Sequence, residues 1–289
     1  MTPRELDHNL RQIVRDSVDE LSASNPKGVS FTADGPFPVL PTGPTATVFL
    51  GRQTSGFATY NARGSTAAGA WFAHATPVMV ASVRAFEILS DELELHDAPS
   101  DLATRAERAA RETMIHALAM GALARRYGGL PRPPMLTQPA GRTLEQMACE
   151  NAIEGCVRET FGALVALVQA ESAADPAVRD AMRAVARDEI RHAALAWEID
   201  AWARTQLPAW ALRRIDDARE EAFKALYAEL ANDPAPELIR ALGLPSAARA
   251  EALLDGLCQL VCVAEPVLWL TERYGYAVES VEQIAPMCG

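Results

Sequence analysis

The sequence predicts an all-α protein whose centre is a bundle of two antiparallel helix pairs. Alanine is abundant along the 289 residues, and the alternation of apolar and polar residues that is typical of strands is rare. Capping residues and helix breakers divide the middle of the chain into four long helical stretches. Short loops join the helices within each pair and a longer link joins the pairs, which favours a bundle.

Composition limits the classes of function. With 49% hydrophobic residues, the chain is able to bury a large core and is expected to form one large domain or one and a half. A net charge of -11 argues against nucleic acid or an anionic membrane as the main partner, because binding to phosphates needs a basic face. The polar amino terminus and the lack of a run of about eighteen apolar residues predict a cytoplasmic protein.

The cysteines give no sign of a disulfide framework. Their number, five, is odd, and the chain has no Cys-x-x-Cys. We interpret them as small residues of the interior, since free cysteine is among the most often buried residue types. They are Cys149, Cys156, Cys258, Cys262 and Cys288.

The amino-terminal region predicts one helix followed by an arm. Thr2 and Glu5 form a capping box with Pro3 at the first helical position, and an apolar stripe then predicts a helix over residues 3–21. Residues 25–70 are rich in proline and glycine. Within them, segments 47–50 and 57–60 flank a short polar turn, which predicts a small hairpin or an extended arm.

The bundle helices are each marked by a capping residue: Thr76 before Pro77, Ser100, Thr143 with Gln146 in a second capping box, and Asp175 before Pro176. The predicted ranges are 76–95, 100–127, 143–171 and 175–204. Beyond Pro208, shorter helices separated by prolines are expected. The chain therefore divides into a helix and arm over 1–75, the bundle over 76–206, and a helical extension over 207–289 that packs on the bundle.

The clearest chemical motif is Glu189-Ile190-Arg191-His192, a Glu-x-x-His pair on the last predicted bundle helix. Three residues span about one turn, so Glu189 and His192 lie on one face and are able to bind one cation together. The second bundle helix contains an incomplete copy of this motif. His116 is present there, but Thr113 stands three residues before it and the nearest carboxylate is Glu112.

Three phrases resemble the ferritin-like superfamily of carboxylate-bridged dinuclear metal proteins, and within it a group of bacterial ferritin-like domain proteins of poorly defined function. They are Ala-Ser-Val-Arg-Ala-Phe at 81–86, Glu-Gly-Cys-Val-Arg-Glu-Thr at 154–160, and Asp-Glu-Ile-Arg-His-Ala-Ala-Leu-Ala-Trp at 188–197. The resemblance covers roughly residues 76–205. It implies a ferritin-like four-helix bundle with a metal site between the helix pairs.

In this family the ligands are one Glu from the first helix, Glu-x-x-His from the second, one Glu from the third and Glu-x-x-His from the fourth. The resemblance gives Glu189 and His192 the role of ligands, and Asp188 the role of holding the histidine of the opposite pair. On the third helix either Glu154 or Glu159 matches the ligand. These two are five residues apart and point in different directions on an α-helix, so both remain open.

The other helix pair departs from the family pattern. The alignment puts Met79 and Thr113 where two glutamates belong, and Glu112 at the position that holds a histidine. A divalent ion with too few anionic ligands is poorly compensated in the interior, so one iron or manganese ion is expected rather than two. Glu87 and Glu112 are candidate replacement ligands. The expected ligands are His116, Glu189, His192, and Glu154 or Glu159.

The resemblance therefore predicts a metal-dependent oxidoreductase that acts on a small organic substrate, with His116, Glu189 and His192 in catalysis. The alternative is a metal-free bundle, in which these three residues act as acid and base or the protein is a binding or assembly module. Iron storage is disfavoured because more than half of the chain lies outside the four helices. The sequence leaves a monomer and a homodimer open.

The remaining histidines and tryptophans have ordinary structural interpretations. His8, His74 and His96 are expected at a helix start, in a loop and at a helix end. The tryptophans are expected in the core or at helix contacts, and they are Trp71, Trp197, Trp202 and Trp210.

Overall fold

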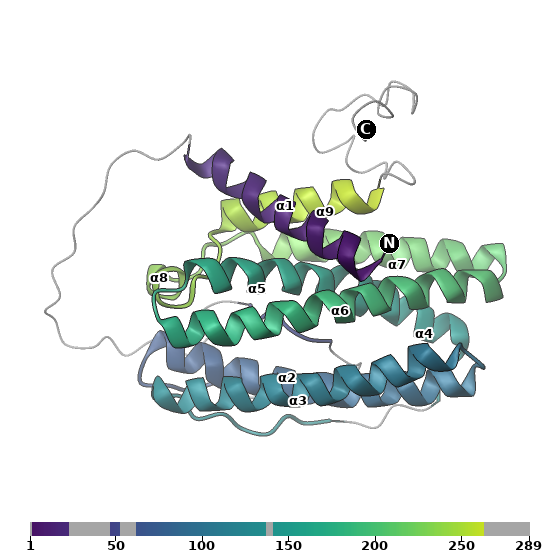
Figure 1. The fold of residues 1–289 in the computed structure, drawn as a ribbon, viewed down its shortest axis with the longest axis horizontal. Coiled ribbons are helices and arrows are strands. Elements are labelled where there is room, and N and C mark those ends of the chain that lie inside the picture. Colours follow the sequence, from purple (N-terminus) through teal and green to yellow (C-terminus); the bar gives the residue numbers. More distant parts are fainter. Residues whose placement is uncertain (1, 23–46, 53–61, 137–140, 263–289) are drawn as a thin grey trace, which may run out of the picture.

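The computed structural model describes residues 2–22, 47–52, 62–136 and 141–262 (Figure 1). These residues form mainly helices, and no strand occurs among them. Gly64 and Gly129 form an isolated antiparallel bridge. The prediction of an all-α protein is confirmed.

The helices follow the order expected from the capping residues, with additional helices at the carboxy-terminal end. Their bounds are α1 Pro3–Ser22, α2 Ala67–Leu95, α3 Ser100–Arg126, α4 Leu144–Glu150, the π-helix η1 Asn151–Glu159, α5 Thr160–Ser172, α6 Pro176–Gln206, α7 Ala209–Glu229, α8 Pro236–Leu242 and α9 Ala247–Cys262.

The helices lie in layers (Figure 1). Helices α2 and α3 form one antiparallel pair. The second pair consists of α6 and the rod of η1 and α5, and it lies above the first pair in the view of Figure 1. The two pairs meet chiefly through α3 and α6. A further layer of α1, α7 and α9 covers the side of the α5–α6 pair that faces away from α2 and α3. The candidate site described below lies between the two pairs.

Helix α2 begins about two and a half turns before the predicted start at Thr76. Thr66 is the capping residue, and its side-chain oxygen accepts a hydrogen bond of 2.9 Å from the backbone N–H of Gly69. Pro77 lies inside the helix rather than at its start. Proline disturbs a helix by removing one N–H donor and crowding one carbonyl. Packing of this largely buried helix outweighs that cost. The predicted bundle boundary at residue 76 therefore falls within α2.

The third predicted helix is a continuous rod made of α4, η1 and α5. Its start has the predicted capping box between Thr143 and Gln146. The sequence pattern gives no sign of the π-helix, whose i→i+5 hydrogen bonds widen the helix over Asn151–Glu159.

The described part of the arm is an irregular segment over residues 47–52, in which Val48, Leu50 and Arg52 are buried. The predicted hairpin partner at 57–60 and most of the arm lie outside the described residues. The segment 47–52 packs against the bundle. The backbone carbonyl of Phe49 lies where a side chain at Gly162 would stand. The Phe49 ring lies edge-on to the Phe161 ring, with 5.2 Å between the ring centres.

As far as the structure describes it, the carboxy-terminal region contacts the other helices through α7 and α9. Helix α7 contacts η1 and α4, and α9 contacts α1 and α5. Within the described ranges, no helix has both the length and the apolar character needed to span a membrane.

One tryptophan differs from its interpretation. Trp210 is 52% exposed near the start of α7, whereas Trp71 is buried and Trp197 and Trp202 pack against the core.

Cys156 and Cys258 are buried free thiols and Cys149 is a partly buried one. His74 lies inside α2 rather than in a loop, because that helix starts earlier than predicted.

Candidate metal centre

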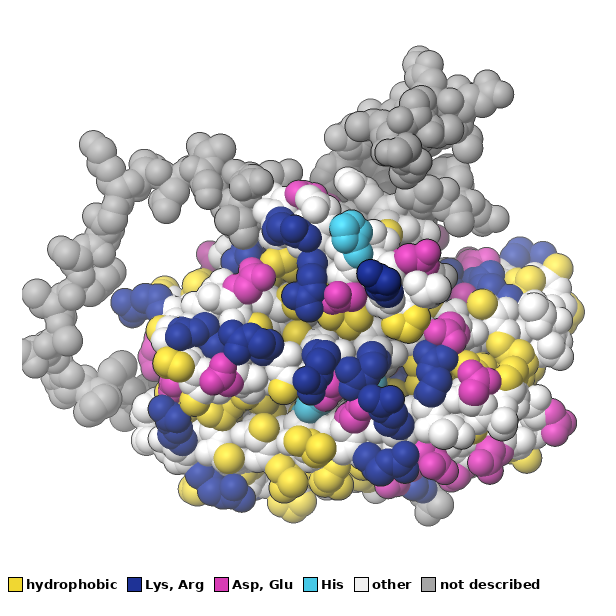
Figure 2. Space-filling model, viewed as in Figure 1, with side chains coloured by type: hydrophobic (Ala, Val, Ile, Leu, Met, Phe, Trp, Pro, Cys, Tyr) yellow, Lys and Arg dark blue, Asp and Glu magenta, His cyan; other side chains and the backbone are white. Residues whose placement is uncertain are grey.

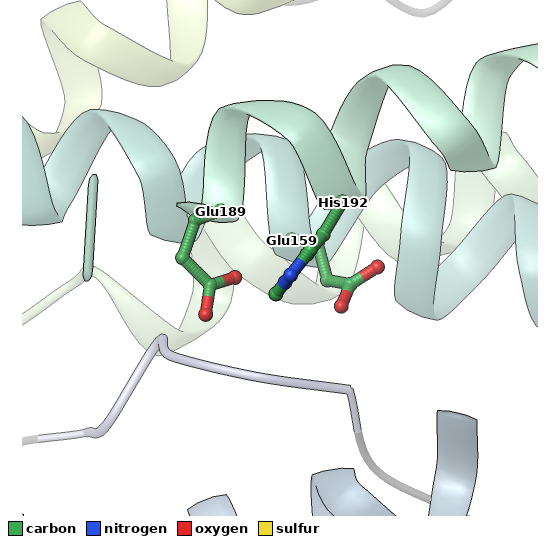
Figure 3. Close-up of side chains that lie close together, drawn as sticks. All are labelled: Glu159, Glu189 and His192. Atoms are coloured by element: carbon green, nitrogen blue, oxygen red, sulfur yellow. The ribbon is translucent and has the colours of Figure 1, made fainter. Parts of the chain in front are cut away.

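Three buried side chains from two helices come together between the helix pairs. Glu189 and His192 project from α6, and Glu159 projects from the end of η1 (Figure 3). One ligand atom of each lies within 4.8 Å of the others, and all three residues are at most 2% exposed. Two carboxylates and an imidazole at this spacing are a donor set that suits iron or manganese.

The structure brings Glu159 into this cluster and leaves Glu154 outside it. The Glu154 side chain lies 3.8 Å from the Arg158 guanidinium and is partly exposed. On an α-helix, residues five apart point in different directions, but the i→i+5 pattern of η1 stacks them more closely. Glu154 is accordingly near enough to contribute to a raised pKa of Glu159.

The two histidines are held reciprocally by carboxylates of the opposite helix. Nε2 of His116 on α3 lies 3.0 Å from Asp188 on α6, and Nε2 of His192 on α6 lies 3.0 Å from Glu112 on α3. Because an ionised carboxylate only accepts, each Nε2 must carry the hydrogen. In the neutral form of each ring, Nδ1 then keeps its lone pair, as a metal ligand requires.

The atoms of the cluster that face its centre have no hydrogen-bond partner among the described residues. Such buried polar atoms are uncommon in native structures and call for an explanation. They include both carboxylate oxygens of Glu159 and of Glu189, and Nδ1 of both His116 and His192. His116 Nδ1 lies 3.7 Å from Glu189, which places it at the edge of the same cluster.

Electrostatics distinguish the inner and outer carboxylates. Burial raises the pKa of Glu159 to about 8, although the neighbouring Arg52 opposes the shift. Burial also works against ionisation of Glu112, but its hydrogen bond with His192 and those from Arg108 and Arg191 lower its pKa to about 2. Glu112 is therefore a fixed anion, whereas the buried Glu159 needs a cation or a proton to be stable.

Burial and neighbouring charges also oppose each other in the pair formed by His116 and Asp188. Burial alone would lower the pKa of His116, but Asp188 and Glu189 raise it to about 9. The pKa of Asp188 is lowered, since His116, Arg191 and Arg187 outweigh its burial. Without a metal ion, the His116 ring is therefore cationic at neutral pH, with a proton on Nδ1 as well as on Nε2. A metal ion that uses its Nδ1 would displace that proton.

An outer layer of arginines covers the carboxylates that hold the histidines. Arg191 donates to both Glu112 and Asp188 at 2.7 Å, which connects α3 and α6 above the cluster. Arg108 and Arg187 add further hydrogen bonds to these two carboxylates. Figure 2 shows Lys and Arg side chains gathered across the middle of the viewed face, in a protein whose net charge is -11.

The two positions where the resemblance expects further carboxylates hold Met79 and Thr113. Met79 and Thr113 are fully buried, and Thr113 Oγ1 has no hydrogen-bond partner. Glu87 is not a replacement ligand: it is exposed and pairs with Arg84 at 2.9 Å. Glu112 holds His192 instead of joining the inner cluster.

Arg52 is a buried residue of the site that the sequence pattern did not reveal. Its guanidinium Nε lies 3.6 Å from Glu159, and both side chains are at most 1% exposed. It belongs to the arm, where no periodic pattern indicates which residues turn inward. A signal was present in Gly155, a glycine inside a helix, because such a residue often makes room for a bulky neighbour. A Cβ there would lie 2.2 Å from Arg52 Nη2.

Comparison of the chain with known protein families, with curated proteins and with solved structures found no match.

Proposed function

We propose that this protein is a metal-dependent oxidoreductase that holds one non-haem iron or manganese ion and acts on a small organic substrate. Glu159, Glu189, His192 and His116 would hold the ion. The observation that supports this proposal is the set of buried donor atoms without hydrogen-bond partners. Glu159, Glu189 and His192 each offer one such atom within 4.8 Å of the others, and His116 Nδ1 lies 3.7 Å from Glu189. A cation would satisfy these atoms together, which no single proton can do.

The donor set fits one ion better than two. Two imidazole nitrogens and two carboxylates supply enough ligands for one iron or manganese ion and leave coordination positions open. Such an ion would supply one-electron redox chemistry at those positions. Met79 and Thr113 offer no carboxylate on the other side, so a second ion would lack anionic ligands there.

The surrounding residues prepare the site for such an ion. Asp188 and Glu112 fix the orientation of the two imidazole rings, and Arg191 holds both carboxylates in place. The ligand side chains are at most 2% exposed, so a substrate must be small or must enter when a helix moves. The π-helix η1 borders the cluster, and π-helical turns are frequent at functional sites.

A second candidate is a metal-free protein of the same fold, with an acid–base or a binding function. The ion pair between Arg52 and Glu159 favours it, because it neutralises one inner carboxylate without a metal. A protonated His116 beside Glu189 neutralises the other. In this form the inner cluster is electrically balanced.

Metal content separates the two candidates. Protein purified without chelator should contain close to one equivalent of iron or manganese per chain, and the His192→Ala variant should lose the metal. His96→Ala is a control, because His96 lies at the end of α2, where its ring contacts the backbone carbonyl of Arg142 and not the cluster. Less than about a tenth of an equivalent in the wild type, with loss of stability alone in His192→Ala, would favour the metal-free candidate.

A further inference from the structure

The arm inserts one residue, Arg52, into the bundle beside the cluster. Gly51 precedes it with φ of 73°, a conformation that glycine adopts without strain. A Cβ at Gly51 would lie 2.6 Å from the Met79 side chain, so the arm backbone rests directly on Met79. One turn further along α2, Ser82 Oγ accepts a hydrogen bond of 2.9 Å from the backbone N–H of Arg52.

The guanidinium of Arg52 is held on several sides. Nη2 donates to Asn151 Oδ1 at 2.8 Å, and the guanidinium carbon lies 5.5 Å from the centre of the Phe86 ring. Gly155 leaves the space that the group occupies. These contacts fix its position but do not neutralise its charge. The anion beside it is Glu159, at 3.6 Å.

A buried charge is stable only with a compensating partner, and Glu159 is the carboxylate beside the Arg52 guanidinium. Met79 is the position where the resemblance expects a carboxylate ligand of a second ion. The backbone of Gly51, the residue before Arg52, rests on this methionine, so the segment that brings in the guanidinium packs against the position that has no carboxylate. The Nε atom of Arg52 has no hydrogen-bond partner, so the contact with Glu159 is mainly electrostatic.

We infer that Arg52 is a built-in cation that takes the place of a second metal ion. Its charge compensates Glu159 and repels a second divalent ion, so the cluster is limited to one. The inference rests on the proposed one-metal function. Removal of this positive charge should strengthen the binding of divalent ions, because like charges a few ångströms apart in the interior repel strongly.

The test compares Arg52→Met, which removes the charge, with Arg52→Lys, which keeps it. Mn²⁺ binding is measured by competition with a chelating dye, and bound manganese is counted after gel filtration. The wild type and Arg52→Lys should bind one ion with similar Kd. Arg52→Met should bind with a Kd at least about tenfold lower, or should bind more than one ion per chain. An unchanged Kd and stoichiometry in Arg52→Met would overturn the inference.

A double-mutant cycle in chelator-treated protein tests the same residue without metal. Arg52→Met should lower Tm, because the buried Glu159 carboxylate then loses the cation beside it and must either stay uncompensated or take up a proton. Adding Glu159→Gln should restore more than half of that loss. Simple additivity of the two Tm changes would mean that Arg52 serves only for packing, and would overturn the inference.

The two proposals fail in different ways. If the wild type binds no metal and the cycle is strongly non-additive, the proposed function is wrong and Arg52 remains the cation of a metal-free cluster. If the wild type binds one ion, Arg52→Met changes neither Kd nor stoichiometry, and the cycle is additive, the metal function stands and the role of Arg52 is wrong.

Discussion

At the scale of single residues, the site consists of inner donors without partners and outer groups that are fully paired. Glu159 and Glu189 have buried oxygens without hydrogen bonds, whereas Glu112 and Asp188 each accept from several donors. Polar networks in the interior are stable when every member is satisfied. The inner atoms are therefore available to the proposed metal ion, while the outer carboxylates hold the histidines in place.

The choice between two glutamates gives a direct prediction at this scale. Glu159→Gln should weaken Mn²⁺ binding by at least about tenfold, since changes even to groups outside the ligand set commonly cost this much. Glu154→Gln is the matched control from the same helix and should leave Kd within about threefold. The measurement is the same dye competition in both variants. An equal loss of Mn²⁺ affinity in both variants would contradict the choice of Glu159 as the ligand.

Glu112 gives a pH prediction. Its pKa is lowered from 4.5 to about 2 in the folded protein, so its contribution to stability is present above about pH 4.5 and is lost as the pH falls toward 2. In chelator-treated protein, Glu112→Gln should be less stable than the wild type at pH 7, and the difference should shrink below pH 4.5. Urea unfolding at a series of pH values measures this. A difference that stays constant down to pH 2.5 would contradict the paired state of Glu112.

At the scale of elements, the rod formed by α4, η1 and α5 is adapted to the residue that packs against it. The π-helix η1 contains Gly155, and Arg52 occupies the space beside this glycine. The end of η1 presents Glu159 to the cluster. One irregular element thus accommodates the guanidinium and positions the proposed ligand Glu159.

Gly155→Ala tests this adaptation. A Cβ at position 155 would lie 2.2 Å from Arg52 Nη2 and 2.5 Å from the Ala196 Cβ, so the variant should be destabilised by about 1–3 kcal/mol. Gly121→Ala on α3 is the control, because its nearest neighbour would be 3.7 Å away. That change should stabilise by about 0.5–1 kcal/mol, because alanine favours a helix more than glycine does. Chemical unfolding measures both, and a neutral Gly155→Ala would contradict the close packing of Arg52.

At the scale of the whole molecule, the sequence predicts the helices well because their signals are local. Capping at Thr143 and Asp175 marks helix starts, and the Glu-x-x-His motif puts Glu189 and His192 on one face. The early start of α2 was missed because Pro77 resembles a helix start and only tertiary packing keeps it inside a helix.

The part of the site that was not predicted depends on contacts between distant segments. Arg52 reaches the cluster from an arm without periodicity, and it lies 107 positions before its partner Glu159 (159 − 52 = 107). The choice of Glu159 over Glu154 depends on which face of η1 packs against α6, and the sequence gives no sign of the π-helix that carries both residues. Local sequence signals thus predict the helices, whereas contacts between distant segments decide which side chains reach the cluster.

The central claim is that the bundle holds one metal ion between its helix pairs, with Arg52 in place of a second. The most direct measurement is anomalous scattering from a crystal of the protein loaded with Mn²⁺. We predict one anomalous peak per chain, in contact with Glu159, Glu189 and His192, and none on the side of Met79 and Arg52. Two peaks in the cluster, or no peak in crystals of fully loaded protein, would contradict the account.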